Sequence, residues 1–265
     1  MITSAANERI KAIRKLHERK ARQESGTFLI EGLRIVAEAV EQVAPVETLI
    51  VAPELLKSEF GWELVAAQRK KNVETLEVGV EVFRRLSVKE GPQGLAAVVR
   101  QQWHTLDKIH PRAGEVWVAL DSVADPGNLG TILRTADAVG ARGIILLDQS
   151  TDPYDPQAVR GSMGALFTQA LVHAEFAQFV AWKQREGTAV IGTSDKAQAD
   201  YHACRYPDPI VLLMGSERQG LQTHHLELCD AVVSIPMRGG SDSLNLAVAT
   251  AVVLYEILNQ RRDNP

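Results

Sequence analysis

Hydrophobic residues along the first hundred positions fall into short groups whose spacing alternates between helical and strand-like. Ile10, Ile13 and Leu16 recur at helical spacing, which predicts one helix over residues 1–23. After a short apolar run at 28–30, the pattern predicts strands at 48–52, 73–78 and 94–100, and helices at 33–43, 62–71 and 80–86. Alternating elements of this length predict a small α/β domain over residues 1–100.

The second half of the chain has a more regular pattern. Residues 101–114 contain no apolar run but do contain Pro111 and Gly114, which predicts a linker. Beyond it, strands are predicted at 116–120, 144–147, 189–192, 210–214 and 231–235, and helices at 129–139 and 244–258. Near-continuous apolar strands between helices are typical of a parallel sheet covered on both faces, so residues 115–265 predict a second α/β domain.

Charge is distributed unevenly along the chain. The net charge is −4, but residues 1–23 carry seven basic and two acidic side chains, a net of +5, which leaves −9 for the remainder. A basic arm on an acidic body indicates a polyanion partner such as RNA, although a solvated helix face would carry the same charges. The candidate phosphate contacts of this arm are Arg9, Lys11, Arg14, Lys15, Arg19, Lys20 and Arg22.

Several classes of protein are disfavoured by what the sequence lacks. No stretch reaches the ~18 apolar residues that a membrane helix needs, and residues 1–23 contain no apolar core of a secretory signal. Two distant cysteines without a CxxC pattern favour a reduced, cytoplasmic protein. His225 and Cys229 share a helical spacing, but no further ligand cluster accompanies them, so we predict a helix surface and no metal.

The first candidate motif joins a predicted strand to a predicted helix. Residues 126–127 suggest a turn, and Asn128 is a plausible N-cap of the helix that follows. Arg134 could point its side chain into the ligand crevice at the carboxyl end of a strand. An ordinary strand–turn–helix joint with a surface arginine is the alternative. The segment lacks GxGxxG, which disfavours a dinucleotide-dependent dehydrogenase.

Two further motifs follow predicted strands at 210–214 and 231–235. In the first, Gly215 would expose backbone groups to a ligand, and Glu217 is either a site residue or a solvated carboxylate. In the second, Ser243 is a candidate N-cap of the last helix. Asn245, in the predicted first turn, could offer its amide to a ligand near the positive helix end.

In this order, the motifs resemble the SpoU-type RNA 2′-O-methyltransferases of the SPOUT superfamily. Residues 28–32 and 91–94 likewise resemble the accessory N-terminal domain of that family, which is similar to ribosomal protein L30e, so the resemblance covers almost the whole chain. The segments that carry it are Asn128-x-Gly130-x-x-x-Arg134, Ala158-Val-Arg160-Gly-Ser162-Met-Gly164, Gly215-Ser-Glu217-x-x-Gly220-Leu221, and Ile235-Pro236-Met237 through Ser243-Leu244-Asn245-x-Ala247.

The resemblance implies an α/β catalytic domain with a deep trefoil knot, a homodimer, and S-adenosylmethionine as cofactor. The cofactor contacts that it implies are Thr193, Ser194, Met214, Gly215, Ile235, Met237 and Leu244. The catalytic positions that it implies are Asn128, Arg134, Glu217, Ser243 and Asn245. Arg134 corresponds to a proposed general base, but a guanidinium is normally always charged, so a phosphate clamp is the physically easier role. Glu217 is expected to orient Asn128 or Arg134.

The implied reaction is methylation of a ribose 2′-hydroxyl. The L30e-like domain favours ribosomal RNA, of the 23S type, as substrate. A tRNA 2′-O-methyltransferase and a non-catalytic RNA-binding protein on the same fold remain alternatives, although Arg134 and Asn245, whose loss would favour the latter, are both present.

Overall fold

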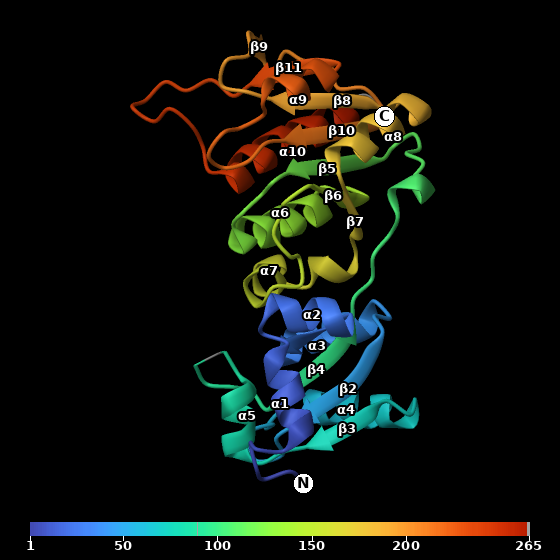
Figure 1. Cartoon of the computed structure of the whole chain (residues 1–265), viewed down its shortest axis with the longest axis vertical. Helices are drawn as coiled ribbons and strands as arrows, with labels where there is room; N and C mark the ends of the chain where they lie inside the picture. Colours follow the sequence, from blue (N-terminus) through green and yellow to red (C-terminus); the bar gives the residue numbers. More distant parts are fainter. Residues whose placement is uncertain (89, 264–265) are drawn as a thin grey trace. The chain divides into compact units, whose positions relative to one another are not determined.

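The computed structural model describes residues 1–88 and 90–263, which form two compact units (Figure 1). Unit 1 comprises Met1–Gln101 together with Tyr154–Phe167, and unit 2 comprises Gln102–Pro153 together with Thr168–Pro265. The segment Tyr154–Phe167 therefore belongs structurally to unit 1, although it lies within the second half of the sequence.

Unit 1 is built on a four-stranded sheet with the order β1-β4-β2-β3. β4 is antiparallel to β1 and β2, whereas β2 and β3 are parallel. Apolar residues of α1 and α5 pack on one face of this sheet in a single core cluster. The elements of unit 1 are α1 (Glu8–Lys15), α2 (Arg19–Ser25), β1 (Thr27–Glu31), α3 (Leu33–Glu41), β2 (Val46–Val51), α4 (Glu59–Lys70), β3 (Glu74–Glu77), α5 (Val80–Leu86), β4 (Leu95–Arg100), α7 (Pro156–Ser162) and the 3-10 helix η2 (Ala165–Phe167).

The single helix predicted over residues 1–23 is wrong, because the chain breaks between α1 and α2. The buried guanidinium of Arg22 donates hydrogen bonds to the carbonyl oxygens of Leu16 and His17, at 3.0 and 2.9 Å. Carbonyls at a helix end have no partner within the helix, so an arginine from the next helix can stabilise the break.

Unit 2 contains a seven-stranded sheet with the order β7-β6-β5-β10-β8-β11-β9, in which every paired strand is parallel. The α/β prediction with a mostly parallel sheet is confirmed; the trefoil knot stays a prediction. The elements of unit 2 are η1 (Leu106–Lys108), β5 (Val116–Asp121), α6 (Pro126–Ala138), β6 (Gly143–Leu147), β7 (Ala170–Ala174), α8 (Phe176–Glu186), β8 (Ala189–Thr193), β9 (Ala199–Asp200), β10 (Ile210–Met214), α9 (Thr223–Leu228), β11 (Ala231–Ser234) and α10 (Leu246–Asp263).

Four neighbouring strands of this sheet, β5, β10, β8 and β11, bring their carboxyl ends to one edge. The loops that leave these ends contain the three sequence motifs and residues 193–194. Ligands of open parallel α/β sheets bind outside this edge, so the topology gathers the candidate site there.

The second part of the predicted linker packs against unit 2. Leu106 and Ile109 are buried in its core, and the indole Nε1 of Trp182 donates a 2.8 Å hydrogen bond to the Ile109 carbonyl. The sequence did not predict α7, β7, α8 or α9, whose apolar runs are short. Among the described residues, no helix is long and apolar enough to cross a membrane.

Candidate active site

A chain of hydrogen bonds joins one side chain from each of the three motifs. The Asn128 Nδ2 donates to Glu217 Oε1 at 3.1 Å, and the Asn245 Nδ2 donates to Asn128 Oδ1 at 2.9 Å. Asn245 Oδ1 in turn accepts from the backbone N–H groups of Ala247 and Val248, at 2.9 and 3.3 Å. Residues 117 positions apart in the sequence therefore form one network at the edge of the sheet.

The two ends of this network determine how both amides are oriented. An ionised carboxylate only accepts hydrogen bonds, so Asn128 must present its NH₂ group to Glu217 and its oxygen to Asn245. Backbone N–H groups only donate, so Asn245 must turn its oxygen toward the start of α10. Each amide keeps one N–H that has no hydrogen-bond partner among residues 1–88 and 90–263, and both are available to a ligand.

The N-caps differ from those that the sequence predicted. Asp125 caps α6, because its Oδ1 accepts from the Asn128 backbone N–H at 2.8 Å and Pro126 follows at the first helical position, where its missing N–H costs nothing. Asn128 therefore lies in the first turn. Asn245, not Ser243, caps α10, and Ser243 is exposed two residues before it.

A tight loop after β10 places Glu217. Gly220 donates its backbone N–H to the Ser216 carbonyl at 2.9 Å, and the two residues form an isolated β-bridge. A Cβ on Gly215 would lie 2.1 Å from the Gly220 carbonyl carbon, so only glycine fits where the loop folds back on its own start.

The Glu217 carboxylate binds the loop that precedes α6. It accepts hydrogen bonds from the backbone N–H groups of Ala124 and Asp125, at 3.0 and 3.1 Å, in addition to the bond from Asn128. Partial burial raises the pKa of Glu217, but these hydrogen bonds outweigh it and hold the pKa below its ordinary value. Glu217 is therefore an ionised positioning group at neutral pH and a poor proton acceptor.

Arg134 and Ser243 lie outside this network. Both side chains are exposed, and in the part of the chain that the structure describes neither has a hydrogen bond or ion pair. Six residues of α-helix turn through about 600°, so Arg134 projects from another side of α6 than Asn128. The structure thus brings together Asn128, Glu217 and Asn245, and it leaves Arg134 free to contact another molecule.

The predicted cofactor contacts gather at the ends of three adjacent strands. Thr193 Oγ1 donates to Met214 Sδ at 3.5 Å, and the Ser194 N–H donates to the Val233 carbonyl at 3.0 Å. Ile235 follows β11 directly, beside them. Such an edge presents backbone groups to a ligand.

Two apolar side chains of the same set lie on the long loop before α10. Met237 is 36% and Leu244 37% exposed, although both are hydrophobic. Exposed apolar side chains of this kind suit contact with the apolar parts of a ligand.

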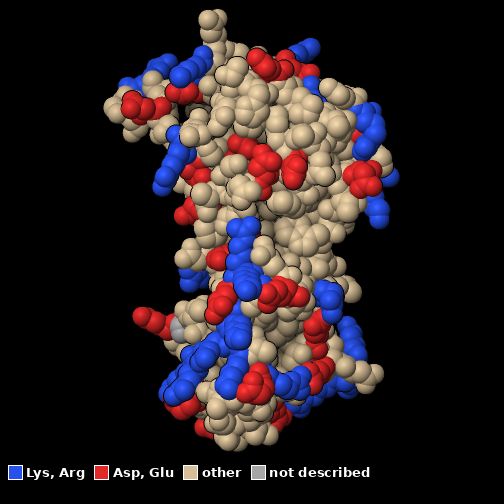
Figure 2. Space-filling view, viewed as in Figure 1, with Lys and Arg blue, Asp and Glu red and all other residues tan. Residues whose placement is uncertain are grey.

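The basic arm of unit 1 divides into paired and unpaired cations. Arg9 pairs with Glu74, Lys11 with Glu8 at 2.7 Å, and Lys20 with Glu24 at 3.8 Å. Arg14 and Lys15 are exposed at the end of α1, without a partner among the described residues. Figure 2 shows Lys and Arg side chains gathered over α1, α2 and α5, with acidic side chains between them.

Arg22 corrects the prediction for this arm. Its side chain is 1% exposed, and besides the two carbonyls at the break between α1 and α2 it binds Asp155 at 3.3 Å. A buried guanidinium cannot reach an RNA phosphate, so Arg22 stabilises unit 1 instead. Arg19 stays exposed in α2.

His225 was predicted on a helix surface, but the structure buries it to 3% exposure. Its Nδ1 accepts from the Gln222 N–H at 3.1 Å, and its Nε2 lies 3.6 Å from Asp121 Oδ1 without a hydrogen bond. Burial lowers the pKa of His225 against the pull of Asp121. Sequence gave no signal for this contact between the first and second motif loops. The described residues contain no group of three metal-ligating side chains.

Two family models match separate parts of the chain. Residues 115–255 match the SpoU rRNA Methylase family, and residues 7–97 match the MRM3-like substrate binding domain. The chain is 36% identical over 253 residues to the 23S rRNA (uridine(2479)-2′-O)-methyltransferase of Streptomyces viridochromogenes, with 93% of this chain and 87% of that protein covered. It is 31% identical to the 23S rRNA (guanosine(2553)-2′-O)-methyltransferase of Bacillus subtilis, with 97% and 98% covered.

Solved structures are similar to this chain over different shares of its length. An AdoMet-bound rRNA methyltransferase from Sinorhizobium meliloti superposes with a TM-score of 0.90 at 37% identity, and covers 100% of this chain and 98% of that one. A structure concerned with 2-OH methylation of C/U34 on tRNA has a TM-score of 0.53 at 30% identity, and covers 57% of this chain and 98% of that one. Similarity to the rRNA enzyme therefore extends over both units.

Proposed function

The chain belongs to the SpoU rRNA methylase family, and we propose that it transfers the methyl group of S-adenosylmethionine to a ribose 2′-hydroxyl of 23S ribosomal RNA. The network of Glu217, Asn128 and Asn245 beside three strand ends is the observation that carries this function. In this proposal, a ribose hydroxyl meets the cofactor at the sheet edge beside the two oriented amide N–H groups of the network. Relatives similar over both units are rRNA 2′-O-methyltransferases.

Alignment is the main task of the protein in this reaction. When bound, S-adenosylmethionine supplies a methyl group that its own sulfonium charge already activates. Asn128 and Asn245 would orient the ribose through their remaining N–H groups, with Glu217 holding both amides in place and Ser243 adding a hydroxyl. Such positioning can contribute ~7–11 kcal/mol in favourable cases.

Arg134 is proposed to hold the RNA. Its guanidinium is exposed and unpaired in the described part of the chain, and it carries a permanent charge that suits bidentate contact with a phosphate. In that position it would also stabilise negative charge that develops on the 2′-oxygen. A role as general base would require a neutral guanidinium, which is costly near neutral pH.

The cofactor is proposed to lie across the ends of β10, β8 and β11. Thr193, Ser194, Met214, Gly215 and Ile235 would contribute mainly backbone groups. Met237 and Leu244 would cover its apolar parts, which accounts for their exposure. Residues 115–265, which include most of unit 2, would thus form the catalytic domain.

Unit 1 is proposed to bind the RNA substrate, as the name of the family matched by residues 7–97 implies. Its exposed cations supply sequence-independent attraction to phosphates. Residues 1–100 would form the RNA-binding domain and residues 101–114 the connection to the catalytic domain. The cations proposed for contact are Arg9, Lys11, Arg14, Lys15, Arg19 and Lys20, together with Arg134 of unit 2.

A homodimer is proposed from the surface of α10. Val248 and Tyr255, seven residues apart on one face, are each 47% exposed, and such an apolar face suits a second copy of the chain. Light scattering should give the mass of a dimer, and Tyr255→Glu should give monomers. We propose that the enzyme acts in the cytoplasm.

Transfer of labelled methyl from S-adenosylmethionine to purified 23S rRNA and, separately, to tRNA tests the function. Nucleoside analysis should recover a 2′-O-methylated nucleoside from the ribosomal RNA alone. Label confined to tRNA would overturn the proposed substrate. Cofactor binding without transfer to naked or ribosomal-particle RNA would favour a non-catalytic RNA-binding protein.

A further inference from the structure

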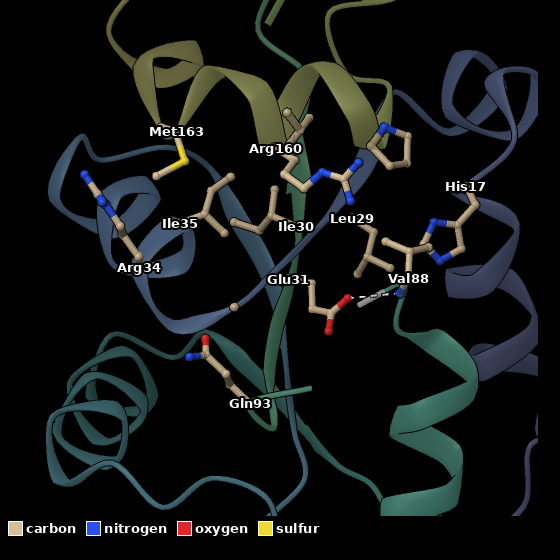
Figure 3. Close-up of a pocket in the computed structure, with 13 residues that line it drawn as sticks. His17, Leu29, Ile30, Glu31, Arg34, Ile35, Val88, Gln93, Arg160 and Met163 are labelled. Atoms are coloured by element: carbon tan, nitrogen blue, oxygen red, sulfur yellow. Dashed lines mark hydrogen bonds between the residues drawn. The ribbon is translucent and has the colours of Figure 1, made fainter. Parts of the chain in front are cut away.

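Unit 1 contains a cavity of about 140 Å³ whose lining residues all belong to that unit. Figure 3 shows that the residues around it come from the end of β1, the start of α3, Val88 after α5, and α7. The cavity takes no part in the catalytic network of unit 2, and the basic arm on α1 and α2 does not account for it.

The inner wall is apolar. Leu29, Ile30 and Val159 line it at 7%, 1% and 4% exposure, and the side chain of Met163 faces the same space from the end of α7 (Figure 3). Met163 is 40% exposed and has a left-handed backbone at φ 54°. An exposed methionine in a strained conformation beside an apolar wall forms a surface suited to a flat, apolar ligand.

Two arginines flank this wall. Arg34 and Arg160 line the cavity, are exposed, and have no hydrogen bond or ion pair within the described residues. Four other exposed arginines of unit 1 differ, since each pairs with a glutamate: Arg9, Arg69, Arg84 and Arg100. Arg34 also lies in the first turn of α3, where the helix dipole disfavours a cation. No described residue forms an ion pair with either charge, so both guanidiniums suit an anion from outside.

Fixed polar groups complete the lining. Glu31 accepts from Ser87 Oγ and from the Val88 N–H at 3.2 Å. His17 Nε2 lies 2.8 Å from the Leu86 carbonyl, which can only accept, so Nε2 carries the proton. His17 Nδ1 is then a buried acceptor that has no hydrogen-bond partner among the described residues.

We propose that this cavity binds one unpaired nucleotide of the RNA substrate, an inference that rests on the proposed function. The base lies against Ile30 and Met163, and the flanking phosphates bind Arg34 and Arg160. A free anion would leave the apolar wall unused, and an apolar ligand would leave the arginines unused. Unpaired nucleotides are also the part of RNA whose bases proteins read most directly.

Methyl transfer to 23S rRNA at several salt concentrations tests the proposal in the full chain. Arg34→Gln/Arg160→Gln should raise KM for RNA about tenfold and reduce the salt slope of binding by about 0.7 for each lost phosphate contact. kcat at saturating RNA and the Kd for S-adenosylmethionine should not change. Arg100→Gln removes a paired cation of the same unit outside the cavity and should leave KM within about twofold.

The variant Met163→Asn tests the proposed contact with the base separately from the contacts with the phosphates. Asn tolerates a left-handed backbone, so the folding stability should not fall, but the apolar contact is lost. KM for RNA should rise several-fold with the salt slope unchanged. Equal effects of the arginine double variant and Arg100→Gln, or an unchanged KM in Met163→Asn, would overturn the proposal.

Photocrosslinking keeps this inference distinct from the proposed function. Ribosomal RNA that contains 4-thiouridine or 6-thioguanosine should crosslink to peptides that include residues 29–35 or 159–163, and the arginine double variant should lose the crosslink. If wild-type protein crosslinks there but transfers no methyl group, the proposed function fails and the nucleotide site stands. If methyl transfer occurs without such a crosslink, the nucleotide site fails alone.

Discussion

The two units use polar side chains in opposite ways. In unit 2, Glu217, Asn128 and Asn245 hold one another in a chain whose donor and acceptor directions are fixed at both ends. In unit 1, the exposed Arg34 and Arg160 have no partner within the described residues. We propose that unit 2 orients the reacting groups and that unit 1 supplies positive charge for RNA binding. Substitutions in unit 2 should therefore lower kcat, and those in unit 1 should raise KM for RNA.

Arg134 is the exception on which this comparison depends most, because it belongs to unit 2 but is unpaired. Arg134→Ala should lower methyl transfer by about 100-fold or more, the scale of losing a preorganised charge at a reacting centre. Binding of S-adenosylmethionine should be largely kept, as measured by calorimetry. Arg142→Ala, which removes another exposed arginine just after α6, is the matched control. Unimpaired transfer in Arg134→Ala would remove Arg134 from the site.

Glu217→Gln tests orientation directly. The two carboxylate oxygens of Glu217 accept three hydrogen bonds, whereas a glutamine has one acceptor oxygen and an NH₂ donor, so at least one of the donors from Ala124, Asp125 and Asn128 loses its partner. kcat should fall roughly tenfold with KM for RNA little changed. Glu227→Gln, which alters an exposed carboxylate on α9, should behave as wild type.

The pH dependence of stability gives a second measurement on the same variant. The pKa of Glu217 is lowered in the folded chain, so its contribution to stability is present above the ordinary carboxyl value of 4.5 and is lost as pH falls through the lower folded value. Thermal melts of Glu217→Gln should lack that acid dependence. A melt that falls with pH just as in wild type would contradict the assigned contacts of Glu217.

Asn245 has two functions that different substitutions separate. Asn245→Asp keeps an oxygen that caps α10 but loses the NH₂ group that binds Asn128, so stability should hold while kcat falls several-fold. Asn245→Ala should lose both, with a stability cost of about 1 kcal/mol. Ser243→Ala should leave stability unchanged, since Ser243 is not the cap. Equal melting of Asn245→Ala and Ser243→Ala would contradict this assignment.

The α/β fold was accessible from sequence because the strands of unit 2 are almost purely apolar. The predicted strand at 210–214 matches β10, and the predicted helix at 80–86 matches α5. The break between α1 and α2 was not accessible, because it depends on the Arg22 guanidinium, which looks like any other basic side chain in a linear pattern.

The candidate site shows the same limit. Spacing and resemblance identified Asn128, Glu217 and Asn245, yet both N-caps were misassigned, because Asp125 and Asn245 are as suitable for capping in sequence as Asn128 and Ser243, the residues chosen. Only the three-dimensional arrangement distinguishes them. The cavity of unit 1 had no sequence signal, since α7 joins it from more than a hundred residues away.

Arg14→Gln/Lys15→Gln probes the charge-based unit. Both cations are exposed and unpaired among the described residues, so the variant should raise KM for RNA several-fold at low salt, and less at high salt. Each lost phosphate contact should reduce the salt slope by about 0.7 to 0.9, with kcat unchanged. Lys57→Gln, an exposed cation of the same unit, is the control. A lower kcat with unchanged KM would break the division between the units.

His225 tests whether every buried polar group of unit 2 serves orientation. It lies in a buried setting with Asp121, His224 and Asp148 as the charged or titratable groups nearby, and burial lowers its pKa below the ordinary value of 6.5. The unfolded chain therefore binds a proton that the folded chain does not, and stability is lost as pH falls below 6.5. In His225→Gln, the melting temperature should fall less than in wild type as the pH is lowered below 6.5.

The effect on catalysis should be the smallest of those considered, because Gln can still accept the Gln222 N–H and the Glu217 network does not include His225. His104→Gln, at an exposed histidine of unit 2, should melt with the pH profile of wild type. If His225→Gln instead lowers kcat as strongly as Glu217→Gln does, then the contact between His225 and Asp121 positions the first and second motif loops, and the oriented network of unit 2 extends to α9.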